Sequence, residues 1–437
     1  MANPTAKIIM KIFPLKTARD NGEMYRYDST EGIFKNDGER LVRETTEKIL
    51  GSYSKKSRKT DVVSSVQDLT YFDRSEFALN PHLLVVANGV LNLKTLEMKP
   101  FSPLPPQITR LPVAFDPTAK FEDTRTKNFF EEVCTPVQIL QIQEVFGYVL
   151  WRDHFIQKGI MLVGEGGNGK TTLICLLKDF LGAKNVSGVR LQDLDLSRFA
   201  VADLQGKMAN LNADVTDKTL KDTGRFKMLT GGDLINAEKK FMQPFDFVNY
   251  AKLIFAVNQV PQSRDLSVAF MRRWLIMEFL QVFPENDPKT DKNILKKMNT
   301  PKALSALLNW SLKGLTRLLK NQGFTDEPTH EQTKEEYLRR SSSVASFIMD
   351  MIEEDFDSMI PKDELYREYV LYCQRNGRTD IKSLSWFSQE LVRYCPVATS
   401  FKPHGKPRSW KNIWYKNQPK NIVPSENSSK QPKIGDF

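Results

Sequence analysis

One short segment constrains the fold of this 437-residue chain more than any other. Residues 164–171 read Gly-Glu-Gly-Gly-Asn-Gly-Lys-Thr, a full match to the pattern G-x-x-x-x-G-K-[ST]. The apolar run Ile160–Val163 predicts a buried strand directly before it, and residues 172–181 predict a helix directly after it. A strand, a glycine-rich loop and a helix in this order are typical of a phosphate-binding loop. The chain is therefore expected to contain an α/β domain that binds a nucleotide.

The chemistry of such a loop suggests a role for each of its residues. Glycines allow successive backbone N–H groups to converge on phosphate oxygens, and the following helix adds the positive end of its dipole. Lys170 would reach the β- and γ-phosphates of ATP, and the hydroxyl of Thr171 would join the coordination shell of Mg²⁺. The expected nucleotide-binding residues are Gly164, Gly166, Gly167, Asn168, Gly169, Lys170, Thr171 and Thr172.

The central region continues the α/β pattern beyond this loop. Apolar runs at 208–211, 253–257 and 275–277 are each bounded by turn-forming or charged residues and alternate with helical patterns. Such alternation predicts a parallel sheet. A helix rich in apolar residues on one face leads into this region, and we place the whole central domain at residues 125–335.

An ATP-hydrolysing domain of this kind also needs an acidic side chain on a neighbouring strand. The run 208–211 leads to Asp214, which we expect to hold the Mg²⁺ shell and to polarise the attacking water. Many such ATPases carry two adjacent acids, whereas here the neighbour is Ala213 and the next carboxylate is Asp217. The identity of the general base is therefore open, and Asp214 also fits a helix N-cap after a strand.

The composition excludes several classes of protein. Lys plus Arg total 63 against 53 Asp plus Glu, and the net charge of +10 favours a polyanionic partner. The four cysteines and four histidines are scattered, so neither a disulfide framework nor a transition-metal site is expected. Because no signal peptide and no run of eighteen apolar residues occurs, we expect a soluble, cytoplasmic protein without a membrane segment.

Residues 227–241, which read KMLTGGDLINAEKKF, resemble the motif peculiar to superfamily 3 helicases, especially the helicase part of phage-, plasmid- and poxvirus-type helicase-primases. In that family the segment leads into a β-hairpin that projects into the central channel of a hexameric ring. The resemblance implies that Lys239 and Lys240 grip single-stranded DNA, and that Phe241 either stacks on a base or packs. Two solvated lysines on an edge hairpin are the alternative interpretation.

Two further segments resemble the same family, in the same order. Residues 251–261 contain an apolar run that ends at Asn258, which resembles the family's sensor and would orient the attacking water or contact the γ-phosphate. A turn-forming asparagine is the alternative. Arg272 and Arg273 lie where the family carries an arginine finger that reaches the nucleotide of the neighbouring subunit. We favour Arg273 for this role, and ion pairing at the surface is the alternative for both.

The resemblance extends to both sides of the central domain. Residues 1–124 are expected to form an N-terminal α+β accessory domain, with a hairpin whose turn is Asn88-Gly89. Residues 341–416 resemble the family's small winged-helix domain, and residues 417–437 are expected to be a disordered basic tail.

Within the winged-helix region, we expect helices at 365–372 and 383–394 and a wing strand at 408–414. Basic residues around the wing are interleaved with Trp410, Trp414 and Tyr415, a mixture that suits phosphates and exposed bases. A solvated basic segment behind a structural wing is the alternative. The expected DNA-binding residues here are Lys402, Lys406, Arg408 and Lys411.

Two Asp-x-Asp pairs have the spacing of a primase metal site. Asp193 and Asp195 fall inside the central domain, and Asp355 and Asp357 fall in an acidic stretch expected to be helical. Since neither pair has a nearby histidine, we interpret the chain as lacking a primase catalytic domain.

These observations predict an α/β protein with an AAA+-like P-loop motor between an N-terminal α+β domain and a C-terminal winged-helix domain. The resemblance implies an ATP-dependent replicative DNA helicase of a plasmid or virus, acting as a Mg²⁺-dependent homo-hexamer. Its expected partners are single-stranded and forked DNA and a primase or primase domain. A P-loop small-molecule kinase and an origin-binding protein in which ATP locks an oligomer without turnover are the alternatives.

Overall fold

A computed structural model of the chain describes residues 4–78, 80–213, 219–240, 244–284 and 291–416. The chain divides into two compact units, the first up to Thr333 and the second from Lys334. The expected tail at 417–437 lies outside the described residues. Within the described ranges, no helix has both the length and the apolar character needed to cross a lipid bilayer.

The first unit begins with a small mixed sheet packed against three helices. The strands run in the order β3-β2-β1-β4, with β4 parallel to β1 and the other pairs antiparallel. The apolar side chains that join sheet and helices, such as Ile9, Val42 and Val66, are fully buried. The elements are α1 (Pro4–Ile12), β1 (Leu15–Ala18), β2 (Met24–Asp28), β3 (Ile33–Lys35), α2 (Gly38–Leu50), η1 (Gly51–Tyr53), α3 (Lys56–Thr70), β4 (Tyr71–Phe72) and η2 (Arg74–Ala78).

A three-stranded antiparallel sheet follows, made of β5 (Leu83–Val86), β6 (Gly89–Asn92) and β7 (Met98–Lys99). Val86 pairs with Gly89, so the predicted hairpin is confirmed. Its turn is Ala87-Asn88 and not Asn88-Gly89, because Gly89 is already the first residue of β6.

The helical lead-in consists of α4 (Arg125–Val133) and α5 (Pro136–Tyr148), preceded by η3 (Phe121–Asp123). Thr135 forms a capping box with Gln138, which explains why α5 begins there. Helix α12 (Pro301–Asn321) packs closely on α5. The glycine at position 147 permits this approach, because a Cβ atom there would lie 2.7 Å from the carbonyl oxygen of Ser311.

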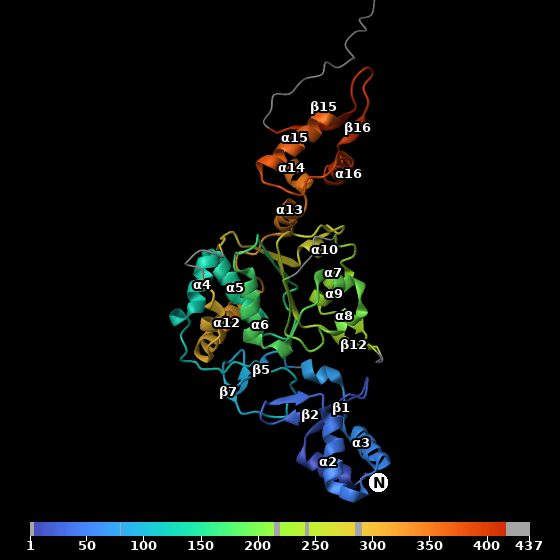
Figure 1. Cartoon of the computed structure of the whole chain (residues 1–437), viewed down its shortest axis with the longest axis vertical. Helices are drawn as coiled ribbons and strands as arrows, with labels where there is room; N and C mark the ends of the chain where they lie inside the picture. Colours follow the sequence, from blue (N-terminus) through green and yellow to red (C-terminus); the bar gives the residue numbers. More distant parts are fainter. Residues whose placement is uncertain (1–3, 79, 214–218, 241–243, 285–290, 417–437) are drawn as a thin grey trace, which may run out of the picture. The chain divides into compact units, whose positions relative to one another are not determined.

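The centre of the first unit is a five-stranded parallel sheet in the order β14-β8-β13-β10-β9. All four apolar runs expected to be strands are in it, so the predicted parallel α/β sheet is confirmed, while the two-residue strand β9 was not predicted. Figure 1 shows α5, α6 (Lys170–Leu181) and α12 on one side of this sheet. On the other side it shows α7 (Leu191–Leu196), α8 (Arg198–Ala202) and α9 (Gly224–Gly231). The strands are β8 (Gly159–Val163), β9 (Val186–Ser187), β10 (Ala209–Asn212), β13 (Lys252–Val257) and β14 (Trp274–Glu278).

The remaining elements of this region connect these strands, except α11 (Ile294–Met298), which follows the last of them. A separate antiparallel hairpin, β11 with β12, lies between β10 and β13 in the sequence. The elements are α6 (Lys170–Leu181), η4 (Ala183–Asn185), α7 (Leu191–Leu196), α8 (Arg198–Ala202), α9 (Gly224–Gly231), β11 (Leu234–Ala237), β12 (Phe245–Val248), α10 (Val268–Met271) and α11 (Ile294–Met298).

In the second unit, three helices pack on an antiparallel sheet of order β15-β17-β16. Their shared core contains Phe347, Tyr369 and Phe387. The elements are α13 (His330–Ser341), in which the boundary between the units falls, α14 (Ser343–Met351), β15 (Ile352–Pro361), α15 (Lys362–Arg375), α16 (Leu384–Tyr394), β16 (Thr399–Phe401) and β17 (Ser409–Tyr415).

The helices predicted at 365–372 and 383–394 and the strand predicted at 408–414 are confirmed as parts of α15, α16 and β17. The expectation of helix at Asp355 and Asp357 was wrong, because both lie in the ten-residue strand β15. That strand carries a register shift between Glu354 and Met359, which obscures the alternation of apolar and polar residues in its sequence.

Candidate functional site

The glycine-rich loop lies between the end of β8 and the start of α6, as the sequence predicts. Gly167 and Gly169 have φ angles of 73° and 87°, a region that favours glycine. A Cβ atom at Gly169 would also meet Val133 Cγ1 at 2.9 Å. These two positions therefore need glycine for backbone and steric reasons, whatever the loop binds.

Lys170 is the first residue of α6, and its side chain folds back into the loop. Its Nζ atom donates hydrogen bonds to Gly164 O at 2.6 Å and Glu165 O at 2.7 Å, and to Asn168 Oδ1 at 2.8 Å. Burial lowers the pKa of this ammonium, and the charge of Glu165 opposes that shift. The ammonium is therefore held among loop oxygens that a phosphate would replace as acceptors.

The buried side chain of Asn168 stabilises the loop through hydrogen bonds. Its Nδ2 atom donates to Phe279 O at 2.8 Å, and only 2% of the residue is exposed. The N–H of Phe283 donates to Gly167 O at 2.7 Å, so the segment after β14 supports the loop at two points. Thr171, in contrast, is exposed on the first turn of α6.

Asn258 lies at the same edge of the sheet as the loop. It directly follows β13, whose last residue Val257 pairs with Val163 at the end of β8. The N–H of Gly164 donates to Val257 O at 3.2 Å, so the two strand ends are hydrogen-bonded neighbours. The exposed Asn258 and the loop are thus brought together, whereas Asp214 lies outside the described residues.

Arg272 and Arg273 lie at the opposite edge of the sheet. They precede β14, whose first residue Trp274 pairs with Gly159 at the start of β8. A five-residue strand spans about 16 Å at about 3.3 Å per residue. The structure therefore does not bring these arginines to the glycine-rich loop of their own chain.

The two arginines also differ in environment. Arg273 is 8% exposed and donates through Nη1 to Ala269 O, and burial, with the charge of Arg272 adding to it, lowers its pKa. Arg272 is exposed and donates through Nη2 to Gln157 Oε1 at 2.8 Å. The accessibility of the two side chains thus favours Arg272 for contacts with another molecule, the reverse of the preference drawn from the sequence.

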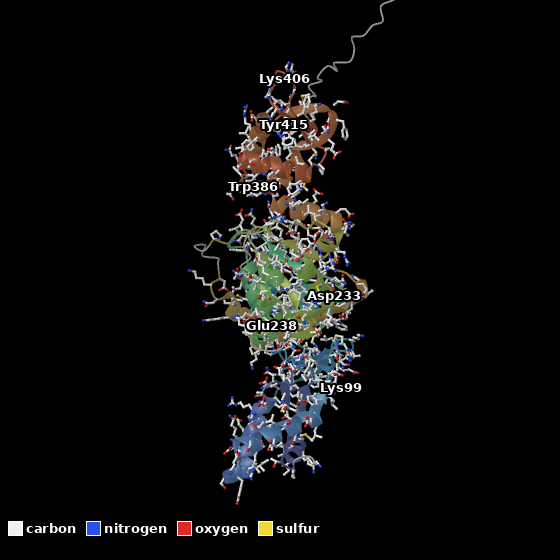
Figure 2. The ribbon with its side chains drawn as sticks, turned by 90° about the vertical axis from the view of Figure 1, so that its right-hand side faces the viewer. Lys99, Asp233, Glu238, Trp386, Lys406 and Tyr415 are labelled. Atoms are coloured by element: carbon white, nitrogen blue, oxygen red, sulfur yellow. The ribbon has the colours of Figure 1, made fainter. Side chains whose placement is uncertain are left out.

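The segment expected to form a hairpin does so, with Ala237 of β11 opposite Phe245 of β12. Figure 2 shows Asp233 and Glu238, which flank β11, on the surface of the first unit. Beyond β11, Lys239 lies half-buried with Nζ 5.6 Å from the centre of the Phe245 ring, and Lys240 is exposed. Phe241 lies outside the described residues.

The base of the hairpin is fixed by residues that the sequence did not single out. Asn249, which follows β12 and is 1% exposed, donates through Nδ2 to Leu229 O at 2.9 Å and Ala251 O at 3.1 Å. At the start of β13, the fully buried Lys252 donates through Nζ to Asp153 O at 2.6 Å. A lysine inside an apolar run was the one sequence signal for this cluster.

In the second unit, Lys402, Lys406 and Arg408 are exposed in the loop between β16 and β17, and Lys411 is half-buried with Nζ 3.6 Å from the centre of the Phe401 ring. Figure 2 shows Lys406 at one end of this unit and Trp386 nearer the other. The aromatic residues expected to contact bases, namely Trp410, Trp414 and Tyr415, are buried in the core. That expectation was wrong, because β17 is the central strand of its sheet.

Three protein-family models match successive parts of the chain. They are described as "D5 N terminal like" over residues 6–135, a family of unknown function (DUF5906) over residues 162–273, and "Poxvirus D5 protein-like" over residues 339–431.

A putative helicase of Acanthamoeba polyphaga mimivirus is 30% identical over 148 residues, which are 32% of this chain and 15% of that protein. Among solved structures, an A form of the NrS-1 C terminal region has a TM-score of 0.51 and 12% identity over 94% of this chain and 98% of that one. The structural likeness shows a shared fold. The D5-type matches at both ends and the helicase-named relative support a relationship to the family of phage- and poxvirus-type helicase-primases.

Proposed function

We propose that the chain is an ATP-dependent DNA helicase of a replicating virus or plasmid, working as a hexameric ring on single-stranded DNA. The observation that carries this proposal is the arrangement around β8 and β13: a phosphate-binding loop and Asn258 at one sheet edge, and the two-lysine hairpin directly before β13. The strand order, with β8 between β13 and β14, supports an AAA+-like P-loop motor.

In this proposal the loop binds the phosphates of ATP. The backbone N–H groups after Gly164 and the ammonium of Lys170 hold the β- and γ-phosphates, since Lys170 already lies among the loop oxygens. The exposed hydroxyl of Thr171 and the carboxylate of Asp214 are the oxygen donors that suit Mg²⁺, which would neutralise charge on the phosphates. The amide of Asn258 orients the attacking water beside the loop.

The position of the arginines supports a ring. Because Arg272 and Arg273 lie about one strand length from their own loop, an arginine finger has to come from a neighbouring subunit. The exposed Arg272 is the better candidate for this contact, with the buried Arg273 holding the end of α10 in place through Ala269 O. ATP hydrolysis would then depend on assembly.

Strand β13 provides a path from nucleotide to DNA. It runs from Lys252, beside the anchored base of the hairpin, to Val257, beside the loop and Asn258. A rigid central strand transmits a shift at one end to the other. Hydrolysis of the ATP bound beside Asn258 would in this way move Lys239 and Lys240 along single-stranded DNA.

The second unit would contact duplex DNA at the fork. Its order of helix, strand, two helices and two strands, with β17 between β15 and β16, supports a winged-helix domain. The exposed Lys402, Lys406 and Arg408 form its wing loop, where cations neutralise backbone phosphates. A primase acting on the same DNA is the expected partner.

The test is displacement of a labelled strand from a tailed duplex in the presence of Mg²⁺ and ATP. The intact chain should displace the strand and Lys170→Ala should not, while the control Lys178→Ala, on the exposed side of α6, should behave like the intact chain. ATP turnover that responds to a small acceptor and not to DNA would instead favour a kinase. ATP binding without turnover would favour a non-catalytic origin-binding protein.

A further inference from the structure

A cavity of about 600 Å³ lies in the first unit between the N-terminal sheet and the hairpin. One wall comes from β2, β3 and η2, and the other from β11, β12, η4 and the segment before β10. Its volume lies within the range of about 300–1,000 Å³ of sites that bind small molecules or single residues of a polymer. The cavity therefore has room for a nucleotide-sized group.

The charged groups of the N-terminal wall are already paired. Arg74 forms ion pairs with Asp20 at 2.8 Å and Glu23 at 3.1 Å. Lys35 forms an ion pair with Asp28 at 2.7 Å. These cations are neutralised within their own wall and are poor anchors for an added anion.

The opposite wall carries three lysines, namely Lys184, Lys207 and Lys239. Within the described part of the chain, none of the three forms an ion pair. The Nζ atom of Lys207 donates to Lys184 O at 2.6 Å, which places the first two side by side. Burial lowers the pKa of Lys207, against the attraction of Asp203, and the charge of Lys239 lowers it further. Asp203 attracts Lys207, and Lys239 acts on Glu23 of the facing wall, where, against the effect of burial, its charge helps to lower the pKa of that carboxyl. The positive charge of this cluster of three ammonium groups is thus only partly compensated.

This cluster is separate from the proposed ATP site. Lys207 precedes Met208 and β10, at the edge of the sheet where the parallel strands begin, whereas the glycine-rich loop follows the end of β8. The rim of the cavity is apolar, with Leu234 62% and Val248 52% exposed. Cations beside apolar surface suit a strand whose phosphates and bases are bound together.

We propose that Lys184 and Lys207, together with Lys239, bind the phosphodiester backbone of single-stranded DNA between the N-terminal domain and the hairpin. Lys239 belongs to both the cavity and the hairpin, so the strand that the hairpin holds continues directly into the cavity. This inference rests on the proposed helicase function and adds the N-terminal domain to the path of the DNA.

The test measures the affinity of a labelled thymidine 20-mer by fluorescence anisotropy between about 50 and 200 mM salt, without nucleotide. Each phosphate contact contributes about 0.7 to the slope of log K against log salt for a single strand. Lys184→Gln/Lys207→Gln should therefore reduce the magnitude of this negative slope by about 1.4. Lys184→Gln alone, at an exposed position, should reduce it by about 0.7. Lys184→Arg/Lys207→Arg should keep the parental slope.

The matched control is Lys120→Gln/Lys302→Gln, which removes two exposed lysines away from the cavity and should leave the slope unchanged. If the intact chain does not bind the 20-mer at all, the proposed function fails. If it binds with a slope that neither cavity variant changes, the helicase proposal stands and the cavity assignment is overturned. A second ATP per chain, seen by calorimetry and lost in Lys184→Gln/Lys207→Gln, would show that the cavity takes free nucleotide and would also overturn it.

Discussion

At the scale of a single residue, the buried side chain of Lys252 makes the stability of the first unit depend on pH. The side chain is fully buried, and burial lowers its pKa from 10.5 to about 7. Between these values the unfolded chain holds a proton that the folded chain has released, so the free energy of unfolding rises with pH. The limiting slope for one such group is about 1.4 kcal/mol per pH unit.

We expect Lys252→Met to remove this contribution, because methionine fills the space without a titratable group. The loss of its bonds to Asp153 O and Tyr250 O shifts stability by a constant that does not depend on pH. Urea unfolding at pH 7.0, 7.8 and 8.5 should give a flatter profile for the variant than for the parent chain. Lys178→Met, at an exposed site, should keep the parental slope, and equal slopes for Lys252→Met and the parent would contradict the argument.

At the scale of elements, the hairpin and β13 should act as one body because of Asn249. Asn249→Ala leaves the carbonyls of Leu229 and Ala251 without this donor, which should cost about 1–3 kcal/mol of stability. It should also weaken the response of ATP hydrolysis to single-stranded DNA more than hydrolysis without DNA. ATP turnover with and without a thymidine oligomer, together with the thermal midpoint, measures both effects.

Asn236→Ala is the matched control, since this residue is exposed on β11 and its Nδ2 donates across the hairpin to Asp246 Oδ1 at 2.9 Å. It should change stability by less than about 0.5 kcal/mol and leave the DNA response intact. If Asn249→Ala loses stability but keeps the full DNA response, then the base of the hairpin is a structural anchor and β13 is not the path of coupling.

The elements also show where the sequence was sufficient. Four strands of the central sheet were predictable because a strand buried on both faces reads as a continuous apolar run, as at Leu253–Val257. Strand β9 has only two residues, too few to show any pattern. The acidic residues of β15 resemble the exposed face of a helix, so this strand was predicted as helical. The lysine hairpin was located through its resemblance to a family motif, not through periodicity.

For the site, the sequence located side chains but did not determine their exposure. Trp410 and Trp414 were expected at a DNA surface because they alternate with lysines, yet their strand is central and both are buried. In the same way, two adjacent arginines look equivalent in the sequence, whereas the end of α10 buries Arg273 and exposes Arg272. Burial depends on tertiary neighbours that no local pattern contains.

At the scale of the whole molecule, the proposed ring would make activity depend on assembly, because the loop and the arginines lie at opposite ends of the paired strands β8 and β14. A chain with Lys170→Ala lacks a working loop but still offers Arg272, and a chain with Arg272→Ala has the reverse defect. Each variant alone should be inactive. Mixed in equal amounts before assembly, they should place an intact loop beside an intact arginine at about one quarter of the interfaces by random assortment.

ATP turnover and strand displacement, measured across mixing ratios, should therefore show a maximum near equal amounts, with both variants forming assemblies of parental mass by light scattering. Arg273→Ala mixed with Lys170→Ala tests the other arginine and should give lower stability through the loss of its bond to Ala269 O. No recovery at any ratio, from variants that assemble normally, would mean that Arg272 does not act across an interface. Recovery with Arg273→Ala but not with Arg272→Ala would assign the finger to the buried arginine and would require α10 to reopen on assembly.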